Sequence, residues 1–304
     1  MRIEPAYYYY PPLIYKDFDA QPISSKFQIF CNPLATPPPL VEVDTVSEPI
    51  TREGVTHFSS GAALIQGILE SGPQVLAFSE IHPRNPSQSP MPFFAEEILP
   101  SIAASGKNAL IIEHLFCDDA IERDLARFYE TGEITAEDTP DLFYNVNLYS
   151  YHEELVELLC RARELRIRII PGGLSRQTAE ETILKPDFEE RPDLELRARA
   201  EIMRNTLAQV RRILESNQTA EEPERVIVYS GRRHNDINPP GVSLNPDMNY
   251  GAVLAERLGE AYYEIDLMSP YLIRLPMLSE DIPASGVNII KNGNSYTVLF
   301  PRDN

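Results

Sequence analysis

The sequence predicts an α/β fold with a mostly parallel central sheet, helices on both faces of the sheet and an antiparallel hairpin at the C-terminus. From about residue 58 onward, short apolar runs alternate with longer amphipathic segments, a rhythm typical of parallel strands joined by crossover helices. Most of the runs are apolar throughout, as in strands that are buried on both faces. Near the end of the chain, Asn292-Gly293 separates two alternating runs, which predicts a β-hairpin.

Each apolar run is short and is closed by polar or turn residues, so it fits a buried strand. The predicted strands cover Gln74–Ile81, Ala109–Leu115, Ile167–Ile170, Arg225–Tyr229, Tyr263–Leu267 and, in the hairpin, Val287–Ile290 and Ser295–Phe300. The segments between them have helical spacing, with capping residues such as Ser60 at their starts. The predicted helices cover Ala62–Glu70, Met91–Ala104, Asp118–Tyr129, Tyr151–Leu165, Leu194–Ser216 and Tyr250–Leu258, and residues 131–148 read as a loop.

The composition divides the chain into two parts. Residues 1–50 are rich in proline and tyrosine, which predicts an extended N-terminal arm, since proline removes backbone donors and disfavours helix. Residues 51–304 carry the alternating pattern and are predicted to form a single α/β domain.

Charge and hydropathy exclude several classes of partner. A formal net charge of -19 repels phosphate backbones and anionic lipid surfaces, so we expect neither nucleic acid nor membrane as a partner. There is no run of about 20 apolar residues that would span a bilayer, and the first residues lack the apolar core of a signal peptide. Three widely spaced cysteines argue against a disulfide framework and for a reducing compartment. We therefore expect a cytoplasmic protein, with secretion by a route that needs no signal peptide as the open alternative.

Polar side chains gather where the predicted strands end. Three of the five histidines lie at such ends. The ends read Ser79-Glu80-Ile81-His82, Glu113-His114, Gly172-Gly173 followed by Ser175-Arg176, and Gly231-Arg232-Arg233-His234. Ligands of open α/β sheets bind beyond the carboxyl ends of the strands. Imidazole and carboxylate groups together suit a divalent transition metal or acid–base chemistry near neutral pH.

Glu113 and His114 are alternative site residues at the end of the second predicted strand. Glu113 follows an apolar run, and a buried carboxylate requires a partner or a metal ion. Because strand side chains alternate, His114 is expected on the opposite face, so Glu113 is the preferred site residue. By the same rule, Glu80 and His82 share a face.

Several other chemistries are not supported by motifs. There is no glycine-rich dinucleotide fingerprint after a strand and no phosphate-binding P-loop. There is also no Gly-x-Ser-x-Gly nucleophile elbow and no HExxH zinc motif.

Taken together, the stretches VLAFSEIHPRN, ALIIEHLF and GRRH resemble the Tiki/ChaN-like superfamily. The match is a first strand ending in a Gly-Glu-x-His-like element, a second ending in a buried Glu, and a later strand ending in Gly-x-x-His. Arg199 and Met203 resemble the Arg-x-x-x-Met helix of that superfamily, and the similarity covers roughly residues 60–267. One difference is Ser79, which stands where the first motif usually has Gly.

The resemblance implies two kinds of activity. Tiki-like members use the two motif histidines and an acidic residue to hold a divalent metal for hydrolysis, whereas ChaN-like members bind haem. Our leading hypothesis is a metal-dependent hydrolase, peptidase- or esterase-like, in which His82, Glu113 and His234 hold Mn, Co, Zn or Fe. Its substrate would be a small molecule or a peptide.

Three further residues complete the hypothesis. Glu80 would act as the general base or a fourth ligand, and Arg199 or Arg176 would stabilise a developing negative charge.

Two alternative functions stay open. One is a haem- or small-ligand-binding protein to which Tyr149, Tyr151 and His152 contribute, and the other is a non-catalytic interaction domain of the toxin or effector type.

Overall fold

The computed structural model describes residues 29–30, 54–82, 88–237, 249–269 and 281–301. Its main sheet has eight strands in the order β2-β9-β10-β8-β3-β7-β4-β6. Their bounds are β2 Val55–Phe58, β3 Val75–Glu80, β4 Asn108–Ile112, β6 Arg168–Pro171, β7 Arg225–Gly231, β8 Tyr262–Met268, β9 Val287–Asn292 and β10 Ser295–Leu299. A separate pair joins β1 (Ile29–Phe30) to β5 (Glu133–Ile134) in antiparallel fashion.

The sheet is parallel except at one strand. From β10 to β6, every neighbouring pair is parallel. β9 is antiparallel to both of its neighbours, β10 and β2. The turn between β9 and β10 contains Gly293 at φ 62°, a conformation that glycine adopts without strain. The predicted α/β class and the C-terminal hairpin are therefore confirmed.

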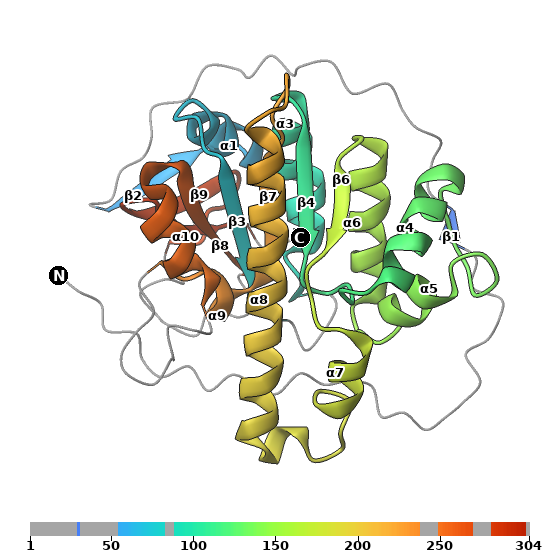
Figure 1. Ribbon diagram of the computed structural model, residues 1–304. Coiled ribbons are helices and arrows are strands. Elements are labelled where there is room, and N and C mark those ends of the chain that lie inside the picture. The colour runs from blue at the N-terminus through green and yellow to red at the C-terminus, as the bar shows by residue number, and fades with distance from the viewer. Residues whose placement is uncertain (1–28, 31–53, 83–87, 238–248, 270–280, 302–304) are drawn as a thin grey trace.

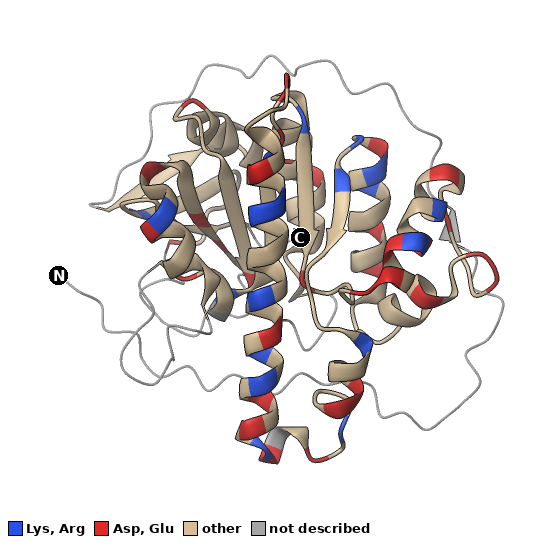
Figure 2. Cartoon of the chain, viewed as in Figure 1, with Lys and Arg blue, Asp and Glu red and all other residues tan. Residues whose placement is uncertain are grey.

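Helices cover both faces of the sheet (Figure 1). The bounds are α1 Gly61–Leu69, α2 Met91–Phe93, a π-helical turn Phe94–Ile98, α3 Leu99–Ala104, α4 Asp119–Thr131, α5 Pro140–Val146, α6 His152–Glu164, α7 Arg176–Glu181, η3 Phe188–Glu190, α8 Pro192–Asn217, α9 Arg232–Asn235, α10 Tyr250–Leu258 and η5 Gly259–Ala261. Charged side chains lie mainly on the helices, while the strands are largely uncharged (Figure 2).

Alternation along β3 separates the two faces. Leu76 and Phe78 point into the larger core, which is completed by α1, α3 and α6. Val75 and Ala77 point into the smaller core beneath α8 and α10. By the same alternation, Glu80 belongs to the first face and Ser79 to the second.

The longest helix extends past the sheet. α8 has 26 residues and is therefore about 39 Å long, whereas the seven residues of β7 span about 23 Å. The C-terminal half of α8 packs on the sheet through residues such as Val210 and Ile213. Its N-terminal half, together with α7 and η3, projects beyond the carboxyl ends of the strands (Figure 1). We call residues 174–203 the overhang.

Three local predictions were wrong. The segment predicted as a loop contains β5 and α5, because Asp124 on α4 accepts the backbone N–H groups of Asp141 and Leu142 and so caps α5. The second strand ends at Ile112, and residues 113–115 form a turn instead of continuing it. Among the cysteines, Cys117 is free but Cys160 is disulfide-bonded.

The predictions of an N-terminal arm and of a chain without a membrane-spanning segment can be compared with the structure only over the described residues. The N-terminal arm lies outside the described residues, except for Ile29 and Phe30 in β1. Across the described parts of the chain, none of the helices has both the length and the apolar character required to cross a membrane.

Candidate functional site

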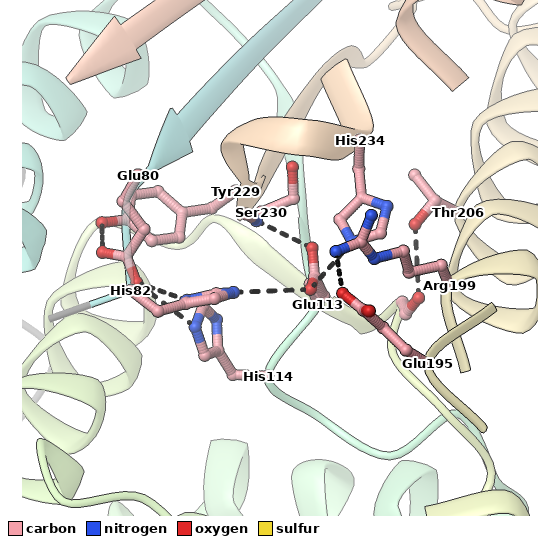
Figure 3. Close-up of polar contacts among 12 residues, drawn as sticks. Glu80, His82, Glu113, His114, Glu195, Arg199, Thr206, Tyr229, Ser230 and His234 are labelled. Atoms are coloured by element: carbon pink, nitrogen blue, oxygen red, sulfur yellow. Dashed lines mark hydrogen bonds and ion pairs between the residues drawn. The ribbon is translucent and has the colours of Figure 1, made fainter. Parts of the chain in front are cut away.

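Two glutamates and three histidines from three neighbouring strand ends meet at the carboxyl edge of the sheet (Figure 3). Glu80 is the last residue of β3, and His82 follows two residues later. Glu113 and His114 form the turn after β4, and His234 lies on α9, directly after β7. The topology explains the grouping, because β3, β7 and β4 are adjacent and parallel and their ends lie on one edge.

Glu80 is fully enclosed by polar partners. Its Oε2 accepts a 2.6 Å hydrogen bond from the Tyr229 hydroxyl. Its Oε1 lies 3.1 Å from His82 Nδ1 and 3.4 Å from His114 Nε2. Only 1% of Glu80 is exposed, so this buried carboxylate can hold both imidazole rings in a fixed orientation.

Glu113 makes two further contacts with histidine side chains. Its Oε1 lies 3.7 Å from His82 Nε2 and 3.6 Å from His234 Nε2. Its Oε2 accepts the backbone N–H of Gly231 at 2.8 Å. The structure thus brings together the predicted His82, Glu113 and His234, with Glu80 behind His82.

His114 is also part of this cluster, contrary to the prediction from strand alternation. Because β4 ends at Ile112, alternation no longer determines the direction of the next side chains. The turn is fixed by Asn145, whose Oδ1 accepts the Phe116 N–H at 2.8 Å and whose Nδ2 donates to the His114 carbonyl at 3.0 Å. The ring of His114 meets that of His82 edge-on, with centroids 5.2 Å apart.

The site requires glycine at two close approaches. A Cβ on Gly231 would lie 2.7 Å from His82 Nε2, so a side chain there would collide with the imidazole. A Cβ on Gly173 would lie 2.0 Å from the Glu113 carbonyl oxygen. Both glycines therefore allow the strand ends to approach closely enough for the histidines and glutamates to meet.

Burial and ion pairing act against each other in the cluster. Burial opposes ionisation of Glu80, but the contacts with His114 and His82 lower its pKa to about 2. Burial likewise opposes ionisation of Glu113, but the charges of His234 and His82 hold its pKa well below the usual range. Burial disfavours the charged form of His82, yet Glu113 and Glu80 raise its pKa to about 10. Near neutral pH both carboxylates are ionised and His82 is protonated.

A metal-binding group is present, but it differs from the predicted set. Among the described residues, Glu80, His82 and His114 each offer a ligand atom, and these atoms lie within 4.8 Å of one another. His114 Nδ1 is buried and has no hydrogen-bond partner in the described part of the chain. One carboxylate and two imidazoles form a donor set that suits Mn, Co, Zn or Fe, and the ion would bind in place of the proton on His82. The residues present therefore fit a divalent ion.

The two predicted arginines occupy different places. Arg199 lies on α8, its guanidinium donates to Glu195 one turn away, and Figure 3 shows it on the same side of the cluster as His234. Arg176 begins α7, where it pairs with Asp141 at 2.7 Å and stacks over Tyr144. Both of these contacts are with residues of α5.

Sequence reasoning missed two residues that shape the site, Tyr229 and Asn145. Tyr229 lies in the apolar run of β7 and pairs in register with Phe78, so its hydroxyl reaches Glu80 on the same face. A tyrosine in a buried strand two residues before the Gly231 turn was an available signal, because a buried hydroxyl requires a partner. Asn145 lay in the segment predicted as a loop and gave no comparable signal.

A second carboxylate cluster lies on the opposite face of the same sheet edge. Ser79 Oγ donates to Asp266 Oδ1 on β8, and Arg232 Nε lies 2.8 Å from Asp266 Oδ2. Glu264 accepts the Ile237 N–H at 2.9 Å. Burial, with the charge of Asp266 adding to it, raises the pKa of Glu264 to about 8. Ser79 thus faces away from Glu80, and its side chain does not crowd the histidines.

A pocket opens beside the Glu/His cluster. The space in and around it amounts to about 420 Å³ when the solvent at its opening is included. Its lining consists of His82, Glu113, His114, Phe116, Tyr149, Tyr151, Leu174, Ile183 and Ile202. Glu80 is not part of the lining, so the carboxylate that reaches the pocket is Glu113.

Comparison with known proteins identifies no family. No protein-family model matches the chain, and no curated protein matches it. Similar solved structures include one described as "Bacterial protein toxins" (TM-score 0.45, 12% identity, covering 80% of this chain and 39% of that chain). The type III effector HopBA1 gives a TM-score of 0.48 at 14% identity, covering 85% of this chain and 97% of that chain.

A third similar structure is the C-terminal region of Pasteurella multocida toxin, which is described as having a thiol-protease-like catalytic triad. It gives a TM-score of 0.40 at 18% identity, covering 57% of this chain and 21% of that chain. This chain thus spans well under half of two of the three structures. At these scores and identities the likeness carries no argument about function, and the Tiki/ChaN-like resemblance stays a prediction.

Proposed function

We propose that this chain is a hydrolase acting on an acyl bond, that of a peptide, amide or ester, with its reaction centre at the polar end of the pocket. The observation that carries the proposal is the position of Glu113. Its Oε1 lies between His82 Nε2 at 3.7 Å and His234 Nε2 at 3.6 Å, at the pocket surface. A buried carboxylate–imidazole pair beside a protonated imidazole is an arrangement suited to acid–base catalysis.

The geometry favours a division of roles among these residues. Glu113 and His234 form the pair that would take a proton from the attacking water, with Gly231 N–H fixing Glu113 through Oε2. His82, held in its protonated form by two carboxylates, would stabilise the developing oxyanion and then supply a proton to the leaving group.

Glu80 fits a positioning role better than that of the general base. Both of its oxygens are occupied, by Tyr229 on one side and by His82 and His114 on the other. It is also excluded from the pocket surface. Its proposed function is to hold the His82 and His114 rings in the orientation in which they face the pocket.

Glu80, His82 and His114 would hold a divalent metal ion, the cofactor we propose. His82 would bind this ion in its neutral form, so the protonated role described above belongs to the metal-free site. Such an ion would supply Lewis-acid polarisation of the substrate carbonyl and a water of lowered pKa. The protein's own contribution would be to fix these ligands through Tyr229 and Asn145.

Elemental mass spectrometry of chelator-free protein, combined with hydrolysis of a panel of p-nitrophenyl esters and fluorogenic peptides, tests the proposal. We expect near-stoichiometric Mn, Co, Zn or Fe in the wild type and its loss in His114→Ala. His57→Ala is the matched control, because His57 lies on edge strand β2, bonded to Asn288, and should retain both metal and activity.

His234→Ala separates the two candidate ligand sets, and should keep the metal but lose activity. Activity in metal-free wild type would remove the metal from the proposal and leave the acid–base site. Metal loss in His234→Ala but not in His114→Ala would favour the set His82, Glu113 and His234. A wild type without hydrolytic activity, with or without metal, would contradict the proposed function.

A further inference from the structure

The pocket changes character away from its polar end. His82, Glu113 and His114 supply polar groups on one side, and the remaining lining is aromatic or aliphatic. A pocket with a reaction centre at its polar end selects its substrate through the group that binds against its apolar end.

The overhang supplies much of this apolar lining. Leu174 precedes α7, Ile183 follows it, and Ile202 lies on the projecting half of α8. Leu174 and Ile183 are 4% and 8% exposed, so they are packed in place instead of extending into solvent. Leu174 and Ile183 belong to the larger core and Ile202 packs against it, so all three are anchored to the body of the domain.

Internal contacts fix the overhang in shape. Glu201 on α8 reaches the start of α7, where its Oε1 accepts the Ser175 N–H at 2.8 Å and the Ser175 hydroxyl at 2.7 Å. Its Oε2 accepts the Thr178 hydroxyl at 2.6 Å. An ion pair between Arg197 and Glu181 joins the same two helices. The apolar wall is therefore preformed.

Aromatic rings close the other side of the pocket. The rings of Tyr149 and Tyr151 lie 5.4 Å apart, and each meets His114 edge-on, at 5.3 Å and 5.7 Å. Phe116 is buried next to the same turn. A ligand group inserted here would contact mainly carbon on both sides, and the charged or titrating His and Glu side chains of the lining lie only at the histidine end.

We propose that this apolar end is a subsite for an uncharged hydrophobic group of the substrate, a leucine- or phenylalanine-like side chain or an acyl chain next to the bond that is cleaved. Ile183 and Ile202 are its specificity-determining residues. A charged group is rejected, because the lining of the subsite offers it no charged partner once water is displaced. The subsite deepens the proposed function and rests on it for the position of the cleaved bond.

Ligand-detected NMR titration tests the subsite independently of turnover. The probes are N-acetyl-leucinamide and N-acetyl-phenylalaninamide, compared with N-acetyl-aspartamide. The wild type and a Glu113→Gln variant should both bind the two apolar amides at least about tenfold more tightly than the charged one. Ile202→Asp should abolish this preference, and Ile183→Ala should weaken it.

Leu196→Asp is the matched control, since Leu196 lies on the same helix, is 48% exposed and does not line the pocket. It should bind as the wild type does, and thermal unfolding of each variant checks that the fold is retained. Equal binding of the charged amide, or an unchanged preference in a folded Ile202→Asp, overturns the subsite. Selective binding by a wild type that hydrolyses nothing would overturn the proposed function and leave the subsite standing.

Discussion

The two faces of the sheet edge carry buried carboxylates with opposite electrostatic behaviour. On the pocket face, Glu80 and Glu113 have imidazole partners, and the pKa of each is lowered. On the other face, Glu264 has Asp266 as its near charged neighbour, and its pKa is raised to about 8. All of these side chains are largely buried, so burial alone does not decide the charge of a carboxylate. The partner decides it.

This difference separates two roles. An ionised carboxylate held by imidazoles at a pocket surface can exchange protons with a substrate. A carboxyl group that is protonated near neutral pH and bonded to the Ile237 backbone, as Glu264 is, contributes to packing and hydrogen bonding. The comparison therefore favours the pocket face for the chemistry that we propose and a structural role for the other face.

The largest effect is expected on removing the central imidazole. His82 contacts both carboxylates of the Glu/His cluster, and His82→Ala leaves Glu80 and Glu113 without this shared partner. We expect hydrolysis to fall by about 10²–10⁴-fold. Steady-state kinetics measure this, and circular dichroism confirms the fold. A fully active His82→Ala would place the reaction centre elsewhere.

A smaller effect is expected at the glycine that faces this imidazole. A Cβ on Gly231 would lie 2.7 Å from His82 Nε2, so Gly231→Ala should displace the ring while leaving the strand intact. We expect kcat to fall by about 10–100-fold with KM nearly unchanged, because a misplaced catalytic group affects the transition state more than binding. The control variant is Gly67→Ala, because Gly67 lies in helix α1 and an added Cβ there would be 3.9 Å from its nearest neighbour. Gly259 is unsuitable as a control position, because alanine would be strained at its φ of 54°. Loss of activity in both variants would argue against a specific role for Gly231.

The opposite face should respond in stability instead of activity. The pKa of Glu264 is raised from 4.5 to about 8, so its contribution to stability is present in full below pH 4.5 and is lost as pH rises to about 8. Glutamine does not ionise, so the variant escapes this loss. Between pH 4.5 and about 8, the free energy of unfolding of Glu264→Gln should therefore rise relative to that of the wild type by on the order of 1–4 kcal/mol. Urea unfolding at pH 4.5 and pH 9 measures the difference. An unchanged gap between the two proteins would mean that Glu264 is not protonated in the folded state.

Much of this arrangement could be predicted from the sequence. Apolar runs such as 74–81 and 225–229 located the parallel strands, because a strand buried on both faces needs continuous hydrophobicity. The rule that sites lie at strand ends then brought Glu80, His82, Glu113 and His234 together, as they are in the structure.

The errors arose where a local rule stopped applying. His114 was excluded by alternation, yet β4 ends at Ile112 and Asn145 holds the following turn. The role of Tyr229 depends on its register against Phe78, which no single strand shows. The metal-binding group of Glu80, His82 and His114 depends on both facts, so the sequence pointed to its location but not to all of its members.

The most direct test of the account compares hydrolysis by two variants that make the same chemical change on opposite faces, Glu113→Gln and Glu264→Gln. Both replace one carboxylate of a buried cluster by its neutral isostere. We predict that Glu113→Gln loses about 10²–10⁴-fold in kcat/KM while Glu264→Gln keeps wild-type turnover at neutral pH. Equal losses in two folded variants, or an active Glu113→Gln, would contradict the assignment of the reaction centre to the Glu/His pocket.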